Sequence, residues 1–226
     1  MKRPVILFGL LIISFYLAAQ DRYQVGLMPS VNFSTGMGKG WKINLKAESR
    51  QRLLQGTFGE ASKSEYDYIL TDFSAIASRK AGLNNSIAGG YLIRFRDTTV
   101  THRLIQQFTV VNRFDNFRLA QRFAADQSFF ESGTMELRLR YRLSAEVPLS
   151  GQAVDPGEFY LKFNNEYLNA FHEGDYDLEI RIVPLAGYEF TDNNKLEFGL
   201  DYRLSGFVNN AGRHSFWITV NWFIST

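Results

Sequence analysis

Residues 134–147, TMELRLRYRLSAEV, carry a charged or hydroxyl side chain at every second position. Guanidinium groups bind carboxylates and phosphates through paired hydrogen bonds, so such a row can form a selectivity ring or a site for an anionic solute. Charges of opposite sign can also pair with one another and fill an interior, because buried charges need partners. The candidate residues for either role are Glu136, Arg138, Arg140, Arg142, Glu146, Glu166, Arg181, Asp201 and Arg203, with Glu179 and Glu197 beside them.

Histidine and serine offer a second kind of chemistry. His214 and Ser215 are adjacent, and lipid hydrolases combine Ser, His and a carboxylate. Neighbouring residues of a strand point to opposite faces, so we do not expect these two side chains to share a hydrogen bond. His172, in the stretch His-Glu-Gly-Asp, belongs to a polar loop rather than a metal-ligand set. We therefore predict no catalytic residue, no metal site and no cofactor.

The elements that position these charges are strands with one apolar and one polar face. In residues 134–147 the odd-numbered positions are apolar, namely Met135, Leu137, Leu139, Tyr141, Leu143, Ala145 and Val147. Period-two alternation predicts a β-strand, and no stretch shows a convincing helical repeat. The same alternation occurs in residues 40–52, 85–97, 157–171, 177–190, 195–207 and 214–226, and less clearly in 66–78, 101–113 and 117–126.

Strand length and export signals favour a membrane barrel over a soluble sheet. The predicted strands have about 10–14 residues, whereas strands in globular proteins average about 5–6. A tilted transmembrane strand needs about 9–11 residues. Residues 1–20 resemble a secretory signal peptide: Lys2 and Arg3 precede the apolar run 5–16, and Ala18 and Ala19 precede the expected cleavage site.

Composition narrows the class further. The chain of 226 residues has a net charge of +2 and contains no cysteine, so it has neither a disulfide framework nor a cysteine metal site. Cleavage of the signal peptide would remove the positive charges of Lys2 and Arg3. The remaining chain is then nearly neutral, which argues against nucleic acid as a partner. Aromatic residues are abundant, with 20 Phe, 11 Tyr and 3 Trp. We predict an all-β, antiparallel transmembrane barrel formed by residues 21–226.

Connection lengths predict the strand number and the topology. Counting from Lys39 gives about ten strands, and residues 23–35 become a further strand-like segment that covers a mouth, enters the lumen or pairs within a twelve-stranded barrel. Short periplasmic turns should alternate with longer external loops. Turns are expected at 36–40, 114–116 and 191–194, and longer connections at 52–65, 124–134, 148–158, 170–176 and 208–213.

The alternation also predicts which face each residue occupies. Leu137, Leu139 and Tyr141 should face lipid, as should Phe198, Leu200 and Ile218, while the candidate charges face the lumen. A barrel of about ten strands is narrow, and long Arg and Glu side chains can fill it. We therefore expect a charge network that largely occludes the lumen.

Several stretches resemble a family of predicted outer-membrane barrels, common in Bacteroidota, whose domain has no known function. They are WKINLKAESR (41–50), THRLIQQF (101–108), ELRLRYRLSAEVPL (136–149), LKFNNEYLNAF (161–171) and KLEFGLDYRLSGF (195–207). The family pattern has an acidic residue before the His-Arg pair, where this chain has Thr101. The resemblance implies an outer-membrane barrel and supplies no activity.

The expected function is that of an outer-membrane barrel, structural or a narrow pore, and not an enzyme. Its partners would be outer-membrane lipid, including lipopolysaccharide, and the outer-membrane assembly machinery, which reads aromatic terminal strands such as FWITVNWFIST (216–226). Two alternatives remain open: an outer-membrane lipid hydrolase acting on lipid A, and a soluble periplasmic barrel that binds a lipid.

Overall fold

Eleven long strands account for most of the chain that the structure describes, residues 21–209 and 211–226. The predicted signal peptide, residues 1–20, lies outside the described residues. In this computed structural model the strands are β1 (Arg22–Gly38), β2 (Trp41–Thr57), β3 (Lys63–Lys80), β4 (Asn85–Arg96), β5 (Thr99–Arg113), β6 (Arg118–Phe129), β7 (Met135–Pro148), β8 (Glu158–His172), β9 (Asp175–Thr191), β10 (Asn194–Ser205) and β11 (Arg213–Ser225). A single turn of 3₁₀ helix (Phe207–Asn209) precedes β11. The described residues include no helix that is both long and apolar enough to span a membrane.

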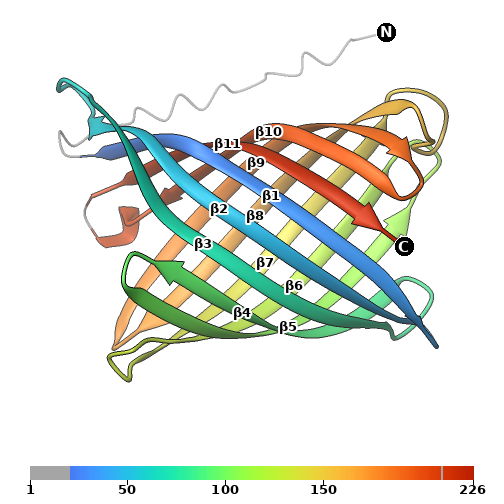
Figure 1. Cartoon of the computed structure of the whole chain (residues 1–226), viewed down its shortest axis with the longest axis horizontal. Helices are drawn as coiled ribbons and strands as arrows, with labels where there is room; N and C mark the ends of the chain where they lie inside the picture. The colour runs from blue at the N-terminus through green and yellow to red at the C-terminus, as the bar shows by residue number, and fades with distance from the viewer. Residues whose placement is uncertain (1–20, 210) are drawn as a thin grey trace, which may run out of the picture.

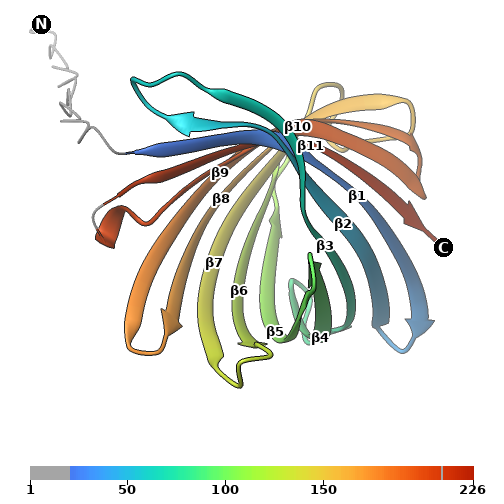
Figure 2. The same ribbon diagram turned by 60° about the vertical axis from the view of Figure 1, so that its left-hand side comes forward.

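The strands form one closed barrel in which each strand pairs antiparallel with its neighbour in the sequence. β1 and β11 close the barrel as a parallel pair, and they lie side by side in both ribbon views (Figures 1 and 2). The mouth where β1 begins is called the amino mouth, and the mouth where β11 ends is called the carboxy mouth. The prediction of an all-β barrel is confirmed.

The strand number of ten, with twelve as the alternative, is wrong by one. Residues 23–35 belong to β1, which pairs with β2 on one side and with β11 on the other. The segment neither covers a mouth nor enters the lumen. Its inward side chains are uncharged and small or flexible, so this segment lacks the charged face that marks the other strands. Its pairing partner could therefore not be predicted from the local pattern.

The parallel seam between β1 and β11 is held by side chains as well as by backbone bonds. Gln24 Nε2 donates to Ser215 Oγ at 2.8 Å, and Ser30 Oγ donates to Asn221 Oδ1 at 2.7 Å. Gly26 lies opposite Trp217, whose indole is almost fully buried against it. A Cβ on Gly26 would lie 2.6 Å from the indole, so the seam requires glycine at this position.

Connections of two to nine residues occur at both mouths, contrary to the expected alternation of turns and long loops, and the longest, 149–157, matches the one predicted at 148–158. They occupy 58–62, 97–98, 130–134, 173–174 and 206–212 at the amino mouth, and 39–40, 81–84, 114–117, 149–157 and 192–193 at the carboxy mouth. The long loops predicted at 52–65 and 124–134 are mostly strand, because β2 continues to Thr57 and β6 to Phe129. Connection length therefore does not distinguish the two mouths.

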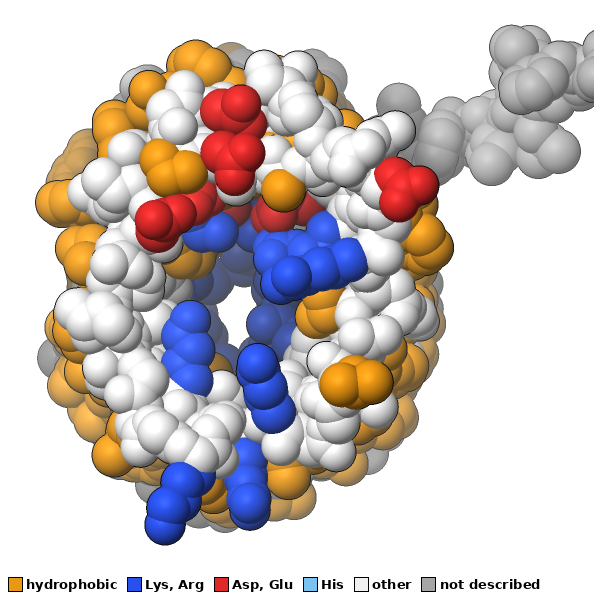
Figure 3. Space-filling model, turned by 90° about the vertical axis from the view of Figure 1, so that its right-hand side faces the viewer, with side chains coloured by type: hydrophobic (Ala, Val, Ile, Leu, Met, Phe, Trp, Pro, Cys, Tyr) orange, Lys and Arg blue, Asp and Glu red, His pale blue; other side chains and the backbone are white. Residues whose placement is uncertain are grey.

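Apolar side chains cover the outside of the barrel, and charged side chains lie inside. Leu139, Phe198, Leu200 and Ile218 are all exposed on the outer surface, whereas Glu166 is only 1% exposed. Leu137 and Tyr141, on the same parity as Leu139, are half-buried. Figure 3 looks into the carboxy mouth and shows Lys and Arg side chains around a central hollow, with hydrophobic side chains on the outer surface. Most large hydrophobic side chains thus lie outside, whereas in a soluble protein they lie inside, although Leu70, Tyr160 and Trp217 are buried within the barrel.

Candidate functional site

The pairing register brings inward charges from five strands into one row. Arg122 on β6 is opposite Arg142 on β7, which is opposite Glu166 on β8. Glu166 is opposite Arg181 on β9, which is opposite Arg203 on β10. Alternation places all five side chains on the interior face, since residues of one row share a face across a sheet.

Glu166 is the centre of this row. Its Oε1 accepts from Arg140 Nη2 at 2.7 Å and lies 3.2 Å from Arg181 Nη1, and its Oε2 accepts from Arg142 Nε at 2.5 Å. Arg122 Nη2 is farther away, 3.8 Å from Oε2. One buried carboxylate therefore contacts four guanidinium groups, so it holds together the interior faces of β6, β7, β8 and β9.

Asp126 on β6 extends the network toward the amino mouth. Its Oδ2 accepts from Arg140 at 3.0 Å and from Arg138 at 3.2 Å, and the residue is completely buried. Arg138 also lies 3.4 Å from Glu136. The ion pairs thus form a continuous chain from Glu136 through Asp126 to Glu166. We call this set of residues the Glu166 network: Arg122, Asp126, Glu136, Arg138, Arg140, Arg142, Glu166, Glu179 and Arg181.

Other predicted site residues pair outside this network. Asp201 accepts two hydrogen bonds from Arg203, at 2.7 and 2.9 Å. Glu146 accepts from Arg118 at 2.8 Å, close to the carboxy mouth. Glu197 is not among the nine principal candidates; it accepts from Lys162 at 2.8 Å and from the hydroxyl of Tyr160 at 2.9 Å. The structure therefore brings six of those candidates into the Glu166 network and leaves Glu146, Asp201 and Arg203 outside it.

Sequence reasoning missed charged residues on the strands with unclear alternation. Asp126 and Arg122 lie on β6. The outward face of this strand also carries polar residues, Gln121 and Gln127, so the two faces differ little in polarity. A strand extended to Phe129 would have shown that Leu119, Phe123 and Phe129 share a parity, and would have placed both charges inside.

A second group of ion pairs lies on β2, β3 and β4 and was also missed. Asp72 accepts two hydrogen bonds from Arg94, both at 2.7 Å. Glu48 accepts from Lys46 and from Arg50, each at 2.7 Å. Alternation in residues 41–50 does place Lys46, Glu48 and Arg50 on the polar face. Nothing in the sequence identified Arg94 as the partner of Asp72, since that pairing depends on strand register.

His214 and Ser215 lie on opposite faces, as the strand geometry requires. Ser215 faces the interior and accepts from Gln24, whereas His214 Nδ1 lies 2.9 Å from the hydroxyl of Tyr202 on the outer face. Asp21 lies 3.6 Å from His214 Nε2. A serine nucleophile requires a base within hydrogen-bond reach, and these two side chains do not provide one to each other. Within the described ranges no cluster of three potential metal ligands occurs.

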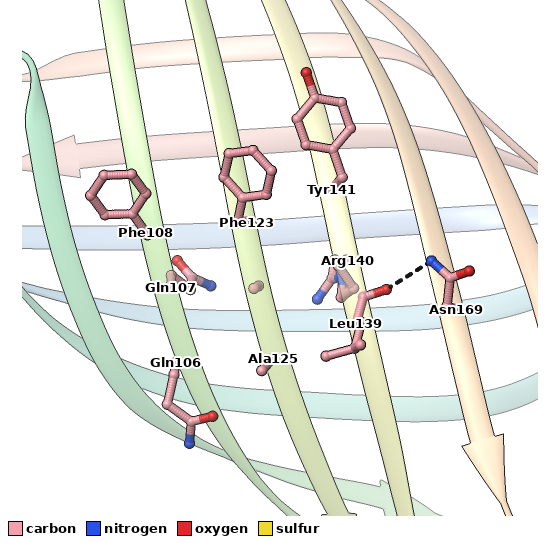
Figure 4. A pocket seen from close by; sticks show the side chains of 10 residues that line it. Gln106, Gln107, Phe108, Phe123, Ala125, Leu139, Arg140, Tyr141 and Asn169 are labelled. Carbon is pink, nitrogen blue, oxygen red and sulfur yellow. Dashed lines mark hydrogen bonds between the residues drawn. The ribbon is translucent and has the colours of Figure 1, made fainter.

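The outer face carries a shallow pocket across β5, β6, β7 and β8 (Figure 4). Phe108, Phe123, Leu139 and Tyr141 line it with small residues between them. Amides on this face are hydrogen-bonded: Gln106 and Gln127 exchange two bonds at 3.0 and 3.1 Å. Such pairing reduces the cost of placing amides in an apolar environment.

The geometry of the interior favours binding and bracing over catalysis. Most inward charges are used in ion pairs, and no nucleophile–base pair is formed by His214 and Ser215. Guanidinium groups that face the hollow can attract anions, whereas those that contact carboxylates hold strands together.

Comparison with known proteins gives a family and no activity. A family model described as a protein of unknown function (DUF2490) matches residues 26–215, from β1 to the start of β11. The match includes the whole of the Glu166 network. No curated protein and no solved structure matches the chain.

Proposed function

The chain belongs to the DUF2490 family of proteins of unknown function, and we propose that it is an integral outer-membrane β-barrel, not an enzyme, whose ion-paired interior leaves a narrow passage. The observation that carries this proposal is the distribution of side chains between the two faces. Exposed large hydrophobic residues occur on the outside of every strand, while the buried charged residues include Asp126, Glu166, Glu197 and Arg203. A closed barrel satisfies its backbone in hydrocarbon, because it has no unpaired edge.

Strand length and aromatic placement support a transmembrane position. The shortest strands have 12 residues, more than the roughly 9–11 that a tilted transmembrane strand needs. Transmembrane barrels carry aromatic girdles at both interfaces. Exposed aromatic residues occur near the amino mouth, at Phe58, Tyr66, Phe95, Phe129 and Phe171, and near the carboxy mouth, at Trp41, Phe114, Phe117, Phe159 and Trp222.

The charged interior supports the membrane barrel over the two alternatives. A soluble lipid-binding barrel needs an apolar interior for its ligand, whereas this interior carries the Glu166 network and its neighbouring pairs. A lipid A hydrolase needs a nucleophile beside its base, and Ser215 and His214 face opposite sides. The proposed role is therefore that of a membrane barrel braced by ion pairs, with outer-membrane lipid and the assembly machinery as its partners.

Fractionation of cells that express the full chain tests the location. The barrel should remain in the outer-membrane pellet after carbonate extraction. Release of the protein by osmotic shock would instead identify a soluble periplasmic protein. Loss of the assembled barrel in Leu139→Arg, but not in the matched control Leu139→Phe, would further support the outward assignment of this face.

Planar-bilayer recording of the purified barrel tests the passage. We expect currents that are small compared with those of a general porin, because long charged side chains project into the hollow (Figure 3). Large and steady currents would contradict the narrow passage. Release of fatty acid by the wild type, lost in His214→Ala, would replace this proposal with the hydrolase.

A further inference from the structure

Two of the five arginines in the Glu166 network, Arg122 and Arg142, have less nearby negative charge than the other three. Arg122 and Arg142 are directly opposite each other on β6 and β7. Like charges at directly opposed positions destabilise a strand pair. Among the residues that the structure describes, Glu166 is the sole carboxylate within ion-pair distance of either guanidinium, at 2.5 Å from Arg142 and 3.8 Å from Arg122.

Glu166 cannot neutralise both arginines, because it is shared. Arg140 and Arg181 also contact it, at 2.7 and 3.2 Å. Those two have carboxylates of their own, since Arg140 contacts Asp126 and Arg181 contacts Glu179. The excess positive charge of the Glu166 network is therefore concentrated at Arg122 and Arg142.

These two arginines are also the most accessible in the network. Their side chains are 30% and 28% exposed, whereas the carboxylate of Glu166 between them is 1% exposed. Alternation along β6 places Ala120 and Ala124 on either side of Arg122 on the interior face, so small side chains leave room beside its guanidinium. A dissolved ion in the hollow would meet the two cations before it met the carboxylate.

A hydroxyl completes the surroundings. Thr109 on β5 is directly opposite Arg122, and parity places it on the interior face. The row thus presents a hydroxyl and two guanidinium groups side by side on three adjacent strands. Guanidinium groups match the oxygens of phosphate and carboxylate through paired N–H donors, and a hydroxyl can donate to the same oxygens.

We propose that Arg122 and Arg142, assisted by Thr109, form a binding site for a small oxyanion of the phosphate type in the interior of the barrel. The bound anion offsets the repulsion between the two arginines. The inference rests on the proposed function, since it assigns a solute class to the narrow passage.

Calorimetric titration of the purified barrel in detergent micelles tests the site. The probes are inorganic phosphate and glycerol phosphate, with chloride at matched ionic strength as the reference. Arg122→Gln should weaken binding by at least about tenfold, the effect of losing one charge-assisted hydrogen bond. Arg118→Gln is the matched control, because Arg118 lies on the interior face of the same strand and pairs with Glu146 at 2.8 Å. Tighter binding of either probe would show whether free phosphate or a phosphorylated solute fits better.

The unfolding temperatures of the same proteins, with and without phosphate, provide an independent test of the site. Without phosphate, Arg122→Gln should unfold at the same temperature as the wild type or higher, because a like charge has been removed. With phosphate, the wild type and Arg118→Gln should gain stability and Arg122→Gln should not. Arg142→Gln is the second variant if Arg122→Gln does not assemble, and it should lose the same phosphate response.

The site would be refuted if phosphate failed to bind the wild type, or if Arg118→Gln and Arg122→Gln lost binding equally. These outcomes are separate from the fate of the proposed function. A membrane-embedded barrel without a phosphate response would refute the site alone. A phosphate response in a protein released by osmotic shock would refute the membrane location and leave the site intact.

Discussion

Replacing Glu166 with glutamine removes the one carboxylate that four arginines share. Glutamine has nearly the same shape, so Glu166→Gln leaves no cavity and changes mainly the charge. The residue is 1% exposed, and each of its carboxylate oxygens accepts from a guanidinium. The variant therefore measures the electrostatic part of the interior network.

The size of the effect follows from which arginines keep a partner. Removing one member of a buried ion pair costs about 3–5 kcal/mol. Arg140 keeps Asp126 at 3.0 Å, and Arg181 keeps Glu179 at 2.5 Å. Arg122 and Arg142 lose their carboxylate, but both are partly exposed to the hollow, where water can solvate them. We therefore expect a loss near the lower limit, about 3 kcal/mol in the free energy of unfolding.

Urea unfolding of the barrel in lipid vesicles, followed by tryptophan fluorescence, measures this loss. Trp217 is a suitable probe, since it is buried at the β1–β11 seam. Glu136→Gln is the control: Glu136 lies at the end of the network, 3.4 Å from Arg138, and should cost less than about 1 kcal/mol. The double variant Glu166→Gln/Arg142→Gln should lose less than Glu166→Gln alone, because it also removes an unpaired cation. Equal losses for Glu166→Gln and Glu136→Gln would refute the reasoning.

Three further predictions concern the walls and the ends of the barrel. Leu139→Arg, on the outer face, should cost about 2–4 kcal/mol and reduce the amount of barrel in the membrane fraction; an unchanged amount would contradict the assignment of faces. Gly26→Ala should lower the unfolding temperature more than Gly36→Ala, because a Cβ on Gly26 meets Trp217 at 2.6 Å while one on Gly36 meets nothing within 4 Å. Short epitope tags after residue 20 and after Thr226 should be accessible from opposite sides of the membrane in intact and lysed cells, since an odd number of strands separates the termini; labelling of both tags from one side would exclude eleven transmembrane strands.

The faces of the strands could be predicted from sequence because alternation is a local property. In residues 134–147, parity alone places Leu139 outside and Arg138 inside, and the structure agrees at both positions. Alternation assigns the two faces less clearly where polar residues face outward. Gln121 and Gln127 on β6 are satisfied by partners on neighbouring strands, so their presence on the outer face carries a small cost that a reading of one strand cannot assess.

Ion-pair partners could not be predicted, because they depend on register. Asp126 contacts Arg138 and Arg140 only because β6 and β7 pair with Asp126 opposite Arg138. A shift of two residues would keep every charge inside and change every partner. The same reason explains the strand number, since whether residues 23–35 pair with β11 depends on closure of the whole barrel rather than on their own alternation.

The parallel seam has a consequence for the order of folding. Every other strand pair joins consecutive strands through a short connection, whereas the seam joins residues 191 positions apart, such as Gln24 and Ser215. Non-local contacts form slowly, because the entropy of loop closure is lost before the contacts form. We therefore expect hairpins to form first, which leaves an open sheet whose two unpaired edges are β1 and β11. Unpaired edges are templates for association with other chains. A chain shortened at either end would keep such an edge permanently, and its expected fate is aggregation rather than a smaller barrel.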